Sequence, residues 1–243
     1  MKAIIVAAGQ GTRLRPLTDD RPKCMVKYKG KEIIDHILET ISACGIDDVT
    51  IIKGYRADVL NKQNTKTYIN ENFDSTNMLS TLFCAEEEME GDVIVSYADI
   101  VYTPEILQAL IDSPHDFSVV VDTKWQELWE SRMEDPLKDA ETMKISSEGT
   151  IVELGKKPTS LDDIQGQYIG LFKISANAIG KVKNFYYSLD RAGTYDGKDF
   201  DNMYMTSFIQ LIIDQLMSVH PVFIDGGWIE IDAPSDLELD PIS

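Results

Sequence analysis

A glycine-rich, basic loop near the start of the chain has the residue types that hold phosphate. It follows an apolar run at residues 3–8 and contains Gly9 and Gly11, which let the backbone turn sharply and approach a ligand closely. Consecutive N–H groups in such a turn can point at an anion. Four cations follow it in the sequence: Arg13, Arg15, Arg21 and Lys23. Together these features favour an anion-binding loop over an ordinary solvated one.

The spacing within the loop excludes the two commonest phosphate-binding loops. A Walker loop needs Gly-Lys-Ser/Thr, which residues 10–23 lack, and a dinucleotide fingerprint needs a third glycine where Leu14 stands. The string Gly-x-Gly-Thr-Arg, followed by Pro22-Lys23, instead resembles the signature of the nucleotidyltransferases that join NTPs to sugar 1-phosphates and other small phosphates.

This resemblance implies a role for each part of the loop. It implies that Arg13 contacts the β and γ phosphates and that Lys23 lies near the α phosphate, so both are expected to be catalytic residues. The residues expected to wrap the triphosphate or lie beside the nucleotide are Ala8, Gly9, Gly11 and Thr12.

Composition narrows the class of protein. The chain has 243 residues, 43% of them apolar and 26% charged, as in an ordinary globular protein. Its net charge of −18 excludes a nucleic-acid or anionic-membrane surface, because both partners would be repelled. The three cysteines are widely spaced and form no disulfide or metal pattern, and no stretch reaches the ~18 apolar residues of a membrane span. We therefore expect a soluble cytoplasmic protein.

The hydrophobic pattern predicts the elements that position the loop. A strand at residues 3–8, a helix at 33–41 and a strand at 49–52 make a β-α-β unit, which requires a parallel sheet. The loop then lies at the carboxyl edge of the first strand, where open α/β sheets bind ligands. Further strands are predicted at 66–69, 92–101, 117–121, 168–174, 221–225 and 227–232, and helices at 76–89, 104–111, 176–189 and 203–217.

These elements predict an α/β fold with a Rossmann-like, mixed but mainly parallel sheet flanked by helices. Two short alternating runs at residues 142–145 and 151–154 predict a small β hairpin, which we assign to the acceptor. The resemblance implies one nucleotidyltransferase catalytic domain over residues 1–243.

Two aspartates end apolar strands and could hold a metal. Asp99 and Asp232 would meet at one edge of the sheet, where two carboxylates can hold Mg²⁺ that also binds triphosphate. Either aspartate alone would more often form a turn or cap a helix. The resemblance favours the metal, because the family's metal aspartates occupy these two motif positions; Asp99 is also assigned to the nucleotide site. We expect Glu230 to point to the opposite side of its strand and Asp236 to belong to the final turn.

The loop at residues 70–77 indicates the branch of the family. Sugar-nucleotide enzymes usually carry a glycine- and alanine-rich segment here, whereas this chain has Asn72-Phe-Asp-Ser-Thr-Asn-Met78. That segment resembles the branch that makes CDP-linked alcohols and amino compounds, which includes phosphocholine and phosphoglutamine cytidylyltransferases. Asn77 is assigned to the nucleotide site, and Ser75 or Thr76 is expected to cap the following helix.

Candidate acceptor ligands lie in the second half of the chain. By resemblance, Lys157 matches a lysine that grips the acceptor phosphate and is expected to be catalytic, with Lys156 as its neighbour; a solvated charge pair is the alternative. Gly170, which follows Tyr168, matches a glycine that lets the acceptor approach the backbone, and a strand bulge is its structural alternative.

An aromatic and charged segment allows two acceptor chemistries. Trp125 and Trp129 could bind a quaternary ammonium through their faces, or Arg132 could clamp a carboxylate with paired hydrogen bonds. Simple packing of the tryptophans is a third possibility. The acidic residues between 134 and 141 could receive an amine, although solvated turns are the simpler interpretation.

The sequence therefore predicts a Mg²⁺-dependent transfer of CMP from CTP to a small phosphate or phosphonate of the phosphoglutamine, phosphocholine or aminoethylphosphonate type, with release of pyrophosphate. The resemblance extends to enzymes that supply cell-surface or capsule polysaccharide. A sugar 1-phosphate nucleotidyltransferase using UTP or dTTP and a non-catalytic nucleotide-binding subunit are the alternatives. A monomer and a homodimer both remain open.

Overall fold

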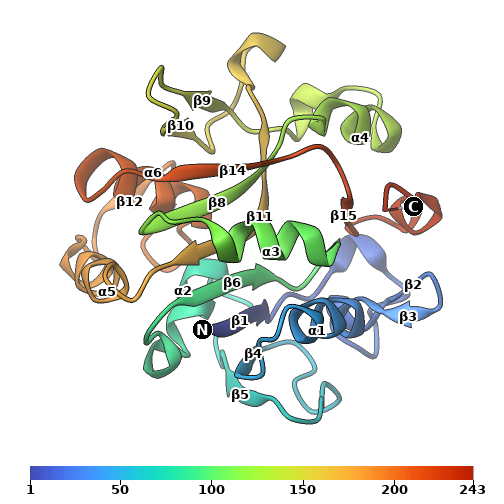
Figure 1. The fold of residues 1–243 in the computed structure, drawn as a ribbon. Coiled ribbons are helices and arrows are strands. Elements are labelled where there is room, and N and C mark those ends of the chain that lie inside the picture. The colour runs from blue at the N-terminus through green and yellow to red at the C-terminus, as the bar shows by residue number, and fades with distance from the viewer. Residues whose placement is uncertain (243) are drawn as a thin grey trace.

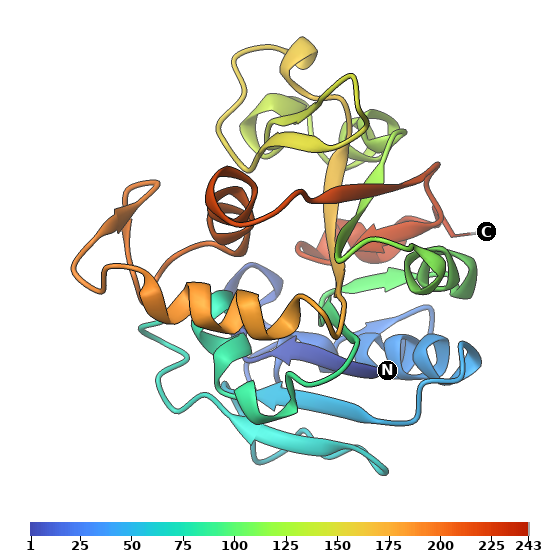
Figure 2. The ribbon, with the colours of Figure 1, turned by 60° about the vertical axis from the view of Figure 1, so that its left-hand side comes forward.

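The computed structural model of the protein describes residues 1–242 and contains a seven-stranded sheet with helices on both faces (Figures 1 and 2). The strand order is β14-β8-β11-β6-β1-β4-β5. The strands are β1 (Lys2–Ala7), β4 (Val49–Lys53), β5 (Lys66–Ile69), β6 (Val93–Tyr97), β8 (Phe117–Asp122), β11 (Gln167–Ile174) and β14 (His220–Ile224). β11 is antiparallel to both of its neighbours and the other pairs are parallel, so the predicted mixed, mainly parallel sheet is confirmed.

Six α-helices cover the two faces of the sheet. They are α1 (Ile33–Ala43), α2 (Met78–Phe83), α3 (Pro104–Asp112), α4 (Trp125–Arg132), α5 (Ile179–Ser188) and α6 (Met205–Gln215). Short 3₁₀ turns occupy Thr12–Leu14, Lys23–Met25, Glu86–Glu88, Pro136–Lys138, Leu161–Asp163 and Pro234–Glu238. Within residues 1–242, none of the helices is long and apolar enough to cross a membrane.

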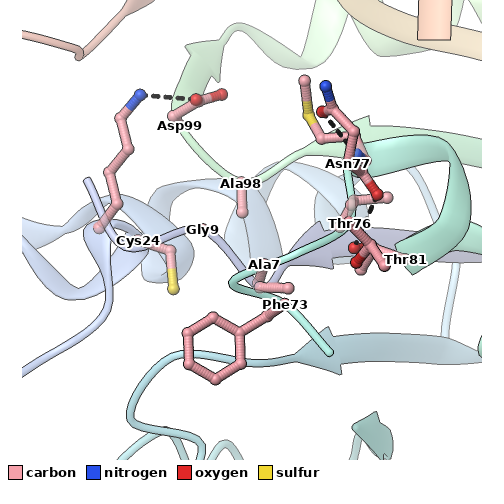
Figure 3. Close-up of a pocket in the computed structure, with 13 residues that line it drawn as sticks. Ala7, Gly9, Cys24, Phe73, Thr76, Asn77, Thr81, Ala98 and Asp99 are labelled. Atoms are coloured by element: carbon pink, nitrogen blue, oxygen red, sulfur yellow. Dashed lines mark hydrogen bonds and ion pairs between the residues drawn. The ribbon is translucent and has the colours of Figure 1, made fainter. Parts of the chain in front are cut away.

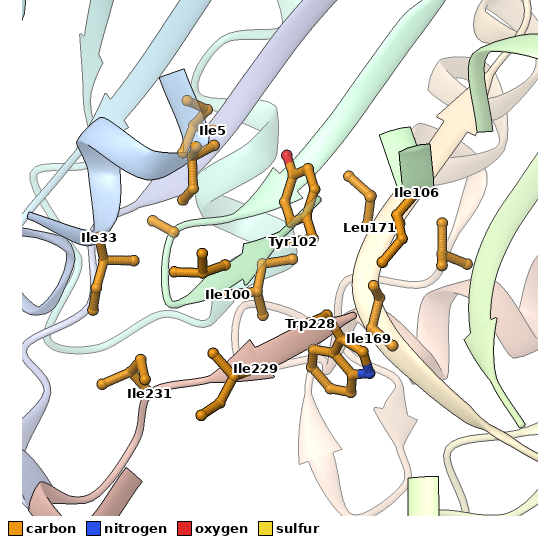
Figure 4. Close-up of a cluster of buried hydrophobic side chains, with 14 of the residues drawn as sticks. Ile5, Ile33, Ile100, Tyr102, Ile106, Ile169, Leu171, Trp228, Ile229 and Ile231 are labelled. Atoms are coloured by element: carbon orange, nitrogen blue, oxygen red, sulfur yellow. The ribbon is translucent and has the colours of Figure 1, made fainter. Parts of the chain in front are cut away.

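The central strand β1 is buried on both sides, which explains its unbroken apolar sequence. Ile5 faces one core with α1, α3 and Trp228, part of which is shown in Figure 4. Ile4 and Val6 face a second core with α2, α5 and α6. Burial on both faces holds the loop that follows β1 at a fixed position on the carboxyl edge of the sheet.

Four two-stranded pairs extend from the main sheet. They are β2 (Lys27–Tyr28) with β3 (Lys31–Glu32), β7 (Ile100–Tyr102) with β15 (Trp228–Glu230), β9 (Met143–Ile145) with β10 (Ile151–Leu154), and β12 (Thr194–Tyr195) with β13 (Lys198–Asp199). The pair β9–β10 confirms the predicted hairpin. In β7–β15, Glu230 pairs with Ile100 and the Ile231 amide donates to the Asp99 carbonyl at 2.8 Å, which brings the segments that carry Asp99 and Asp232 together.

The strand predicted at residues 92–101 is two strands, β6 and β7, which lie in different sheets, and two helices also differ from the prediction. α2 is capped by Asn77, whose side chain accepts a hydrogen bond from the Met78 amide, rather than by Ser75 or Thr76, and it ends at Phe83. Residues 125–132 form the helix α4, although we described this stretch only as an aromatic and charged segment and predicted no helix there. Trp125, Leu128 and Trp129 do follow helical spacing, but charged residues separate them, so the apolar stripe is short.

Candidate active site

The two glycines of the basic loop, Gly9 and Gly11, have different structural roles. A Cβ at Gly9 would meet no atom within 4 Å, so the backbone there is open to a ligand. Gly11 has φ +64, and a Cβ there would lie 2.8 Å from Cβ of Lys23. The loop therefore needs glycine at position 11 to fold against Lys23, whereas Gly9 leaves room in front of the chain.

A pocket of about 570 Å³, partly open to solvent, lies beside this loop; we call it the loop pocket. It is lined by Val6, Ala7, Ala8, Gly9, Lys23, Cys24, Phe73, Thr76, Asn77, Met78, Thr81, Ala98 and Asp99. Figure 3 shows the Phe73 ring on one side of the pocket and Asn77 and Thr76 on another. Ala8, Gly9, Asn77 and Asp99 were assigned to a nucleotide from the sequence, and all four line this pocket; Thr12 lies just beyond it in the 3₁₀ turn.

Side chains at the rim of the loop pocket hold one another in place. Asn70 donates to Thr76 and Thr81, both at 2.9 Å. The Asn77 side chain accepts from the Met78 amide at 2.7 Å and donates to the Asn202 carbonyl at 3.3 Å. The Asn77 backbone is engaged as well, because its amide donates to the Asp201 carbonyl and its carbonyl accepts from the Thr81 amide, so Asn77 shapes the pocket wall.

Lys23 joins the two strand-end aspartates. Its Nζ lies 2.7 Å from Asp99 Oδ2 and 2.8 Å from Asp232 Oδ1, and Arg13 forms a second ion pair with Asp232. Burial opposes the charge of Lys23, but Asp99, Glu230 and Asp232 outweigh that effect and raise the pKa of its ammonium. Lys23 is therefore a permanently charged group, suited to neutralising phosphate and unable to act as a base at neutral pH.

The donor set at the aspartates fits Mg²⁺. Asp99 Oδ1 is buried and has no hydrogen-bond partner, which leaves a carboxylate oxygen available for a cation. No group of three or more histidine, cysteine or acidic side chains in residues 1–242 forms a complete metal cage. Mg²⁺ is usually held by one or two carboxylates together with substrate phosphates, so two aspartates beside a phosphate loop are sufficient.

The expectation that Glu230 points away from Asp232 is corrected by its contacts. Its carboxylate pairs with Arg132 at 3.1 Å and lies near enough to Lys23, Asp99 and Asp232 for their charges to affect its pKa. Burial, reinforced by Asp99, raises the pKa of Glu230, and the cations Lys23 and Arg132 oppose this shift. Asp236 does belong to the final turn, where it accepts hydrogen bonds from the Asp232 and Ala233 amides.

A second pocket, of about 680 Å³, adjoins the first and is rich in aromatic and acidic side chains; we call it the aromatic pocket. Its lining is Met78, Tyr97, Ile100, Trp129, Asp139, Glu141, Gln167, Tyr168, Ile169, Gly170, Tyr204, Met205, Thr206, Trp228 and Glu230. Met78 borders both pockets. The lining contains three carboxylates and no lysine or arginine, so the pocket suits the positive part of a ligand.

Glu141 is the carboxylate most affected by this environment. Burial raises its pKa to about 7; Asp139, Glu230 and Asp196 add to the shift, and a hydrogen bond from Thr206 opposes it. The sequence interpretation of residues 134–141 as solvated turns was therefore incomplete, because Asp139 and Glu141 line the aromatic pocket. Their proximity to Trp129 in the sequence was the only available signal.

Arg132 and Trp125 do not line the aromatic pocket. The Arg132 side chain is only 5% exposed and binds Asp236 and Glu230, each at 3.1 Å. It is thus already paired, which corrects the prediction that it clamps an acceptor carboxylate. Trp125 is 4% exposed and packs edge-on against Trp129, so it serves packing and Trp129 alone reaches the pocket.

The two predicted acceptor lysines lie outside both pocket linings. Lys156 is exposed and pairs with Glu153 at 3.2 Å. Lys157 donates to the carbonyls of Leu137 and Lys138, at 2.5 and 2.9 Å. These carbonyls belong to the turn that precedes Asp139, so Lys157 secures one wall of the aromatic pocket.

Tyr168 and Gly170 both line the aromatic pocket. The need for glycine at position 170 is explained by the backbone conformation and by packing. Gly170 has φ +86 at an irregularity between β11 and β8, and a Cβ there would lie 2.5 Å from the Tyr97 ring. The bulge that we gave as the alternative is present. Glycine at this position lets Tyr97 pack against the strand and form part of the pocket wall.

Comparisons with known proteins agree with this geometry. The chain is 48% identical to CTP:phosphoglutamine cytidylyltransferase of Campylobacter jejuni over 98% of both chains. It is 34% identical to choline-phosphate cytidylyltransferase of Streptococcus pneumoniae over 39% of this chain and 43% of that protein.

Solved structures share the fold. The CTP:phosphocholine cytidylyltransferase of Streptococcus pneumoniae superposes with a TM-score of 0.72 at 21% identity, covering 98% of this chain and 96% of that one. The inositol-1-phosphate CTP transferase of T. maritima also gives 0.72, at 20% identity over 97% and 90%. Since the family model for the MobA-like NTP transferase domain matches residues 3–224, which carry the loop, Lys23 and Asp99, this chain belongs to that family.

Proposed function

We propose that the protein transfers CMP from CTP to a small phosphorylated acceptor of the phosphoglutamine type and releases pyrophosphate. The observation that carries the proposal is the 48% identity to a phosphoglutamine cytidylyltransferase across nearly the whole of both chains. The adjoining loop and aromatic pockets supply separate places for a nucleotide and an acceptor.

The loop pocket would take CTP. Phe73 offers an aromatic face beside the open backbone of Ala8 and Gly9, which suits a base and its ribose. The triphosphate would follow the loop toward Arg13, whose side chain is 68% exposed although its guanidinium pairs with Asp232. Lys23 would then face the α phosphate.

Asp99 and Asp232 would hold Mg²⁺, with Asp99 Oδ1 as one oxygen ligand. The ion would neutralise charge on the triphosphate. Lys23, which bridges the two carboxylates in the free protein, would turn its ammonium toward the phosphates.

The reaction would proceed by in-line attack of an acceptor phosphate oxygen on the α phosphorus, with pyrophosphate leaving on the opposite side. A phosphate monoester is largely a dianion at neutral pH, since its second pKa is about 6, and it needs no general base. The residues of this chain would therefore align two anions and offset their repulsion, as Lys23 and Arg13 are placed to do.

The aromatic pocket would take the rest of the acceptor. Asp139 and Glu141 line it with carboxyl groups, while Glu230 is paired with Arg132, and Trp129 and Trp228 give it aromatic faces. Carboxylates and aromatic faces both stabilise an ammonium group. A hexose 1-phosphate has no cationic group to match them, so this lining favours an amino acceptor over a sugar.

The test is pyrophosphate release measured with each of CTP, UTP, dTTP and ATP against phosphoglutamine, phosphocholine, aminoethylphosphonate and glucose 1-phosphate. We expect turnover with CTP and an amino acceptor, and loss of turnover when EDTA removes Mg²⁺. Turnover only with a hexose phosphate would reject the acceptor class. Absence of turnover with every pair would favour a non-catalytic nucleotide-binding protein.

A further inference from the structure

The β12–β13 hairpin stands at the edge of the aromatic pocket. Asp196 and Gly197 form its turn with φ values of +48 and +79, and Tyr195 pairs with Lys198 across it. The Lys198 ammonium lies 5.4 Å from the centre of the Tyr204 ring, and Tyr204 lines the pocket. The charge of Asp196 also contributes to the raised pKa of Glu141 inside the pocket.

The base of the hairpin is hydrogen-bonded to the start of α2, whose Met78 borders both pockets. The Asp201 carbonyl accepts hydrogen bonds from the Asn77 amide and the Ser80 hydroxyl, and Asn77 also donates to the Asn202 carbonyl. Phe200, which is 2% exposed, anchors the hairpin in the second core. Lys198 is thus presented from a secured turn, at a defined distance from the pocket.

Lys198 is a cation that remains available for the outer part of the aromatic pocket. Arg132 is saturated by Asp236 and Glu230, and Lys157 is held by two carbonyls. Among residues 1–242, no carboxylate forms an ion pair with Lys198, whose contact is the Tyr204 ring. Its flexible stem allows the ammonium to leave that ring for an anion in the pocket mouth.

We propose that Lys198 is a specificity-determining residue that binds the carboxylate of a phosphorylated amino acid in the aromatic pocket. This inference rests on the cytidylyl transfer proposed above and names the acceptor class more closely. An amino acid carries an ammonium and a carboxylate on the same carbon. The carboxylates of Glu141 and Asp139 would bind the ammonium, and Lys198 would bind the adjacent carboxylate, which an acceptor such as phosphocholine lacks.

The test compares KM for phosphoglutamine with Ki for an analogue that lacks the α-carboxylate, at saturating CTP. Lys198→Met should raise KM about tenfold or more, which is the loss of one charge-assisted hydrogen bond. It should change Ki less than about twofold, since the analogue has no group for Lys198. Lys198→Arg should retain most of the preference, and Lys181→Met, at an exposed lysine of α5, is the matched control.

The inference is overturned if Lys198→Met leaves the KM for phosphoglutamine unchanged, or if KM and Ki rise by the same factor, which would indicate general damage to the pocket. A wild-type protein that uses CTP with phosphocholine and not with phosphoglutamine would also overturn it, and would leave cytidylyl transfer standing. No pyrophosphate with any acceptor would instead reject the proposed function. Equal thermal midpoints of the variants confirm that folding is unaffected.

Discussion

Lys23 and Asp99 lie 76 positions apart in the sequence, yet the Lys23 ammonium is 2.7 Å from the Asp99 carboxylate. They meet because β1 and β6 are adjacent parallel strands, and the loops at their carboxyl ends share one edge of the sheet. β15 brings Asp232 to the same ammonium from the far end of the chain. In the free protein, the Lys23 ammonium neutralises the Asp99 and Asp232 carboxylates. Bound phosphates and a metal ion would change these pairings.

Lys23→Met should lower kcat by at least about a hundredfold, since the variant has no cation at the α phosphate. CTP should still bind, because the loop backbone and Phe73 remain. Single-turnover measurement of pyrophosphate release separates the two effects. Lys27→Met, at an exposed lysine four positions along, is the control. A kcat within a few-fold of wild type would reject the role given to Lys23.

Glu141 should make stability depend on pH. Its pKa is raised by burial from 4.5 to about 7, so the folded protein binds a proton more tightly than the unfolded chain. The stabilisation is complete below pH 4.5 and is lost as pH rises through 7. Glu141→Gln should therefore be more stable than wild type at pH 8 by roughly 1 to 3 kcal/mol, with the difference shrinking toward pH 5.

Denaturant unfolding at pH 5, 7 and 8 measures this difference in unfolding free energy, and Glu134→Gln, at an exposed position, is the control.

The variant Glu141→Gln also tests acceptor binding. In wild type, KM for an ammonium-bearing acceptor should fall as pH rises through 7, because Glu141 becomes charged. In Glu141→Gln, the pH dependence of this KM should reflect only the titration of the acceptor phosphate. An unchanged pH profile would place the ammonium elsewhere.

Gly170→Ala should destabilise the protein more than a substitution at an ordinary left-handed glycine. Both Gly170 and Gly30 have φ near +85, but a Cβ at Gly170 would press on the Tyr97 ring, whereas a Cβ at Gly30 would meet nothing within 4 Å. We expect about 1 kcal/mol for Gly30→Ala and at least about 2 kcal/mol for Gly170→Ala. Equal losses of unfolding free energy would show that Tyr97 moves aside freely.

Lys157→Met should raise KM for the acceptor and leave KM for CTP unchanged. The Lys157 ammonium holds the Leu137 and Lys138 carbonyls, and these precede Asp139 in the wall of the aromatic pocket. Lys156→Met, which loses only an exposed pair with Glu153, should have little effect on either constant. A large loss of kcat with normal acceptor KM would instead indicate that Lys157 contacts the reacting phosphate.

Local sequence was sufficient for the central strand of the fold and for the loop that follows it. The apolar run before Gly9 specifies a strand buried on both faces, and glycine at position 11 together with Lys23 specifies the loop, because these features depend on nearby residues. Asp99 and Asp232 were singled out because each ends an apolar run, but it was the resemblance to the nucleotidyltransferases that assigned them to a metal.

The lining of the aromatic pocket was decided by tertiary structure. Whether the Arg132 guanidinium is available to a ligand depends on Glu230 and Asp236, about a hundred positions away. Both carboxylates pair with it. Glu141 becomes a candidate ligand only because Trp129, Thr206 and Glu230 surround it. Sequence spacing determines which side chains share a strand or helix face; packing between distant segments determines which charges are buried, paired or left for a substrate.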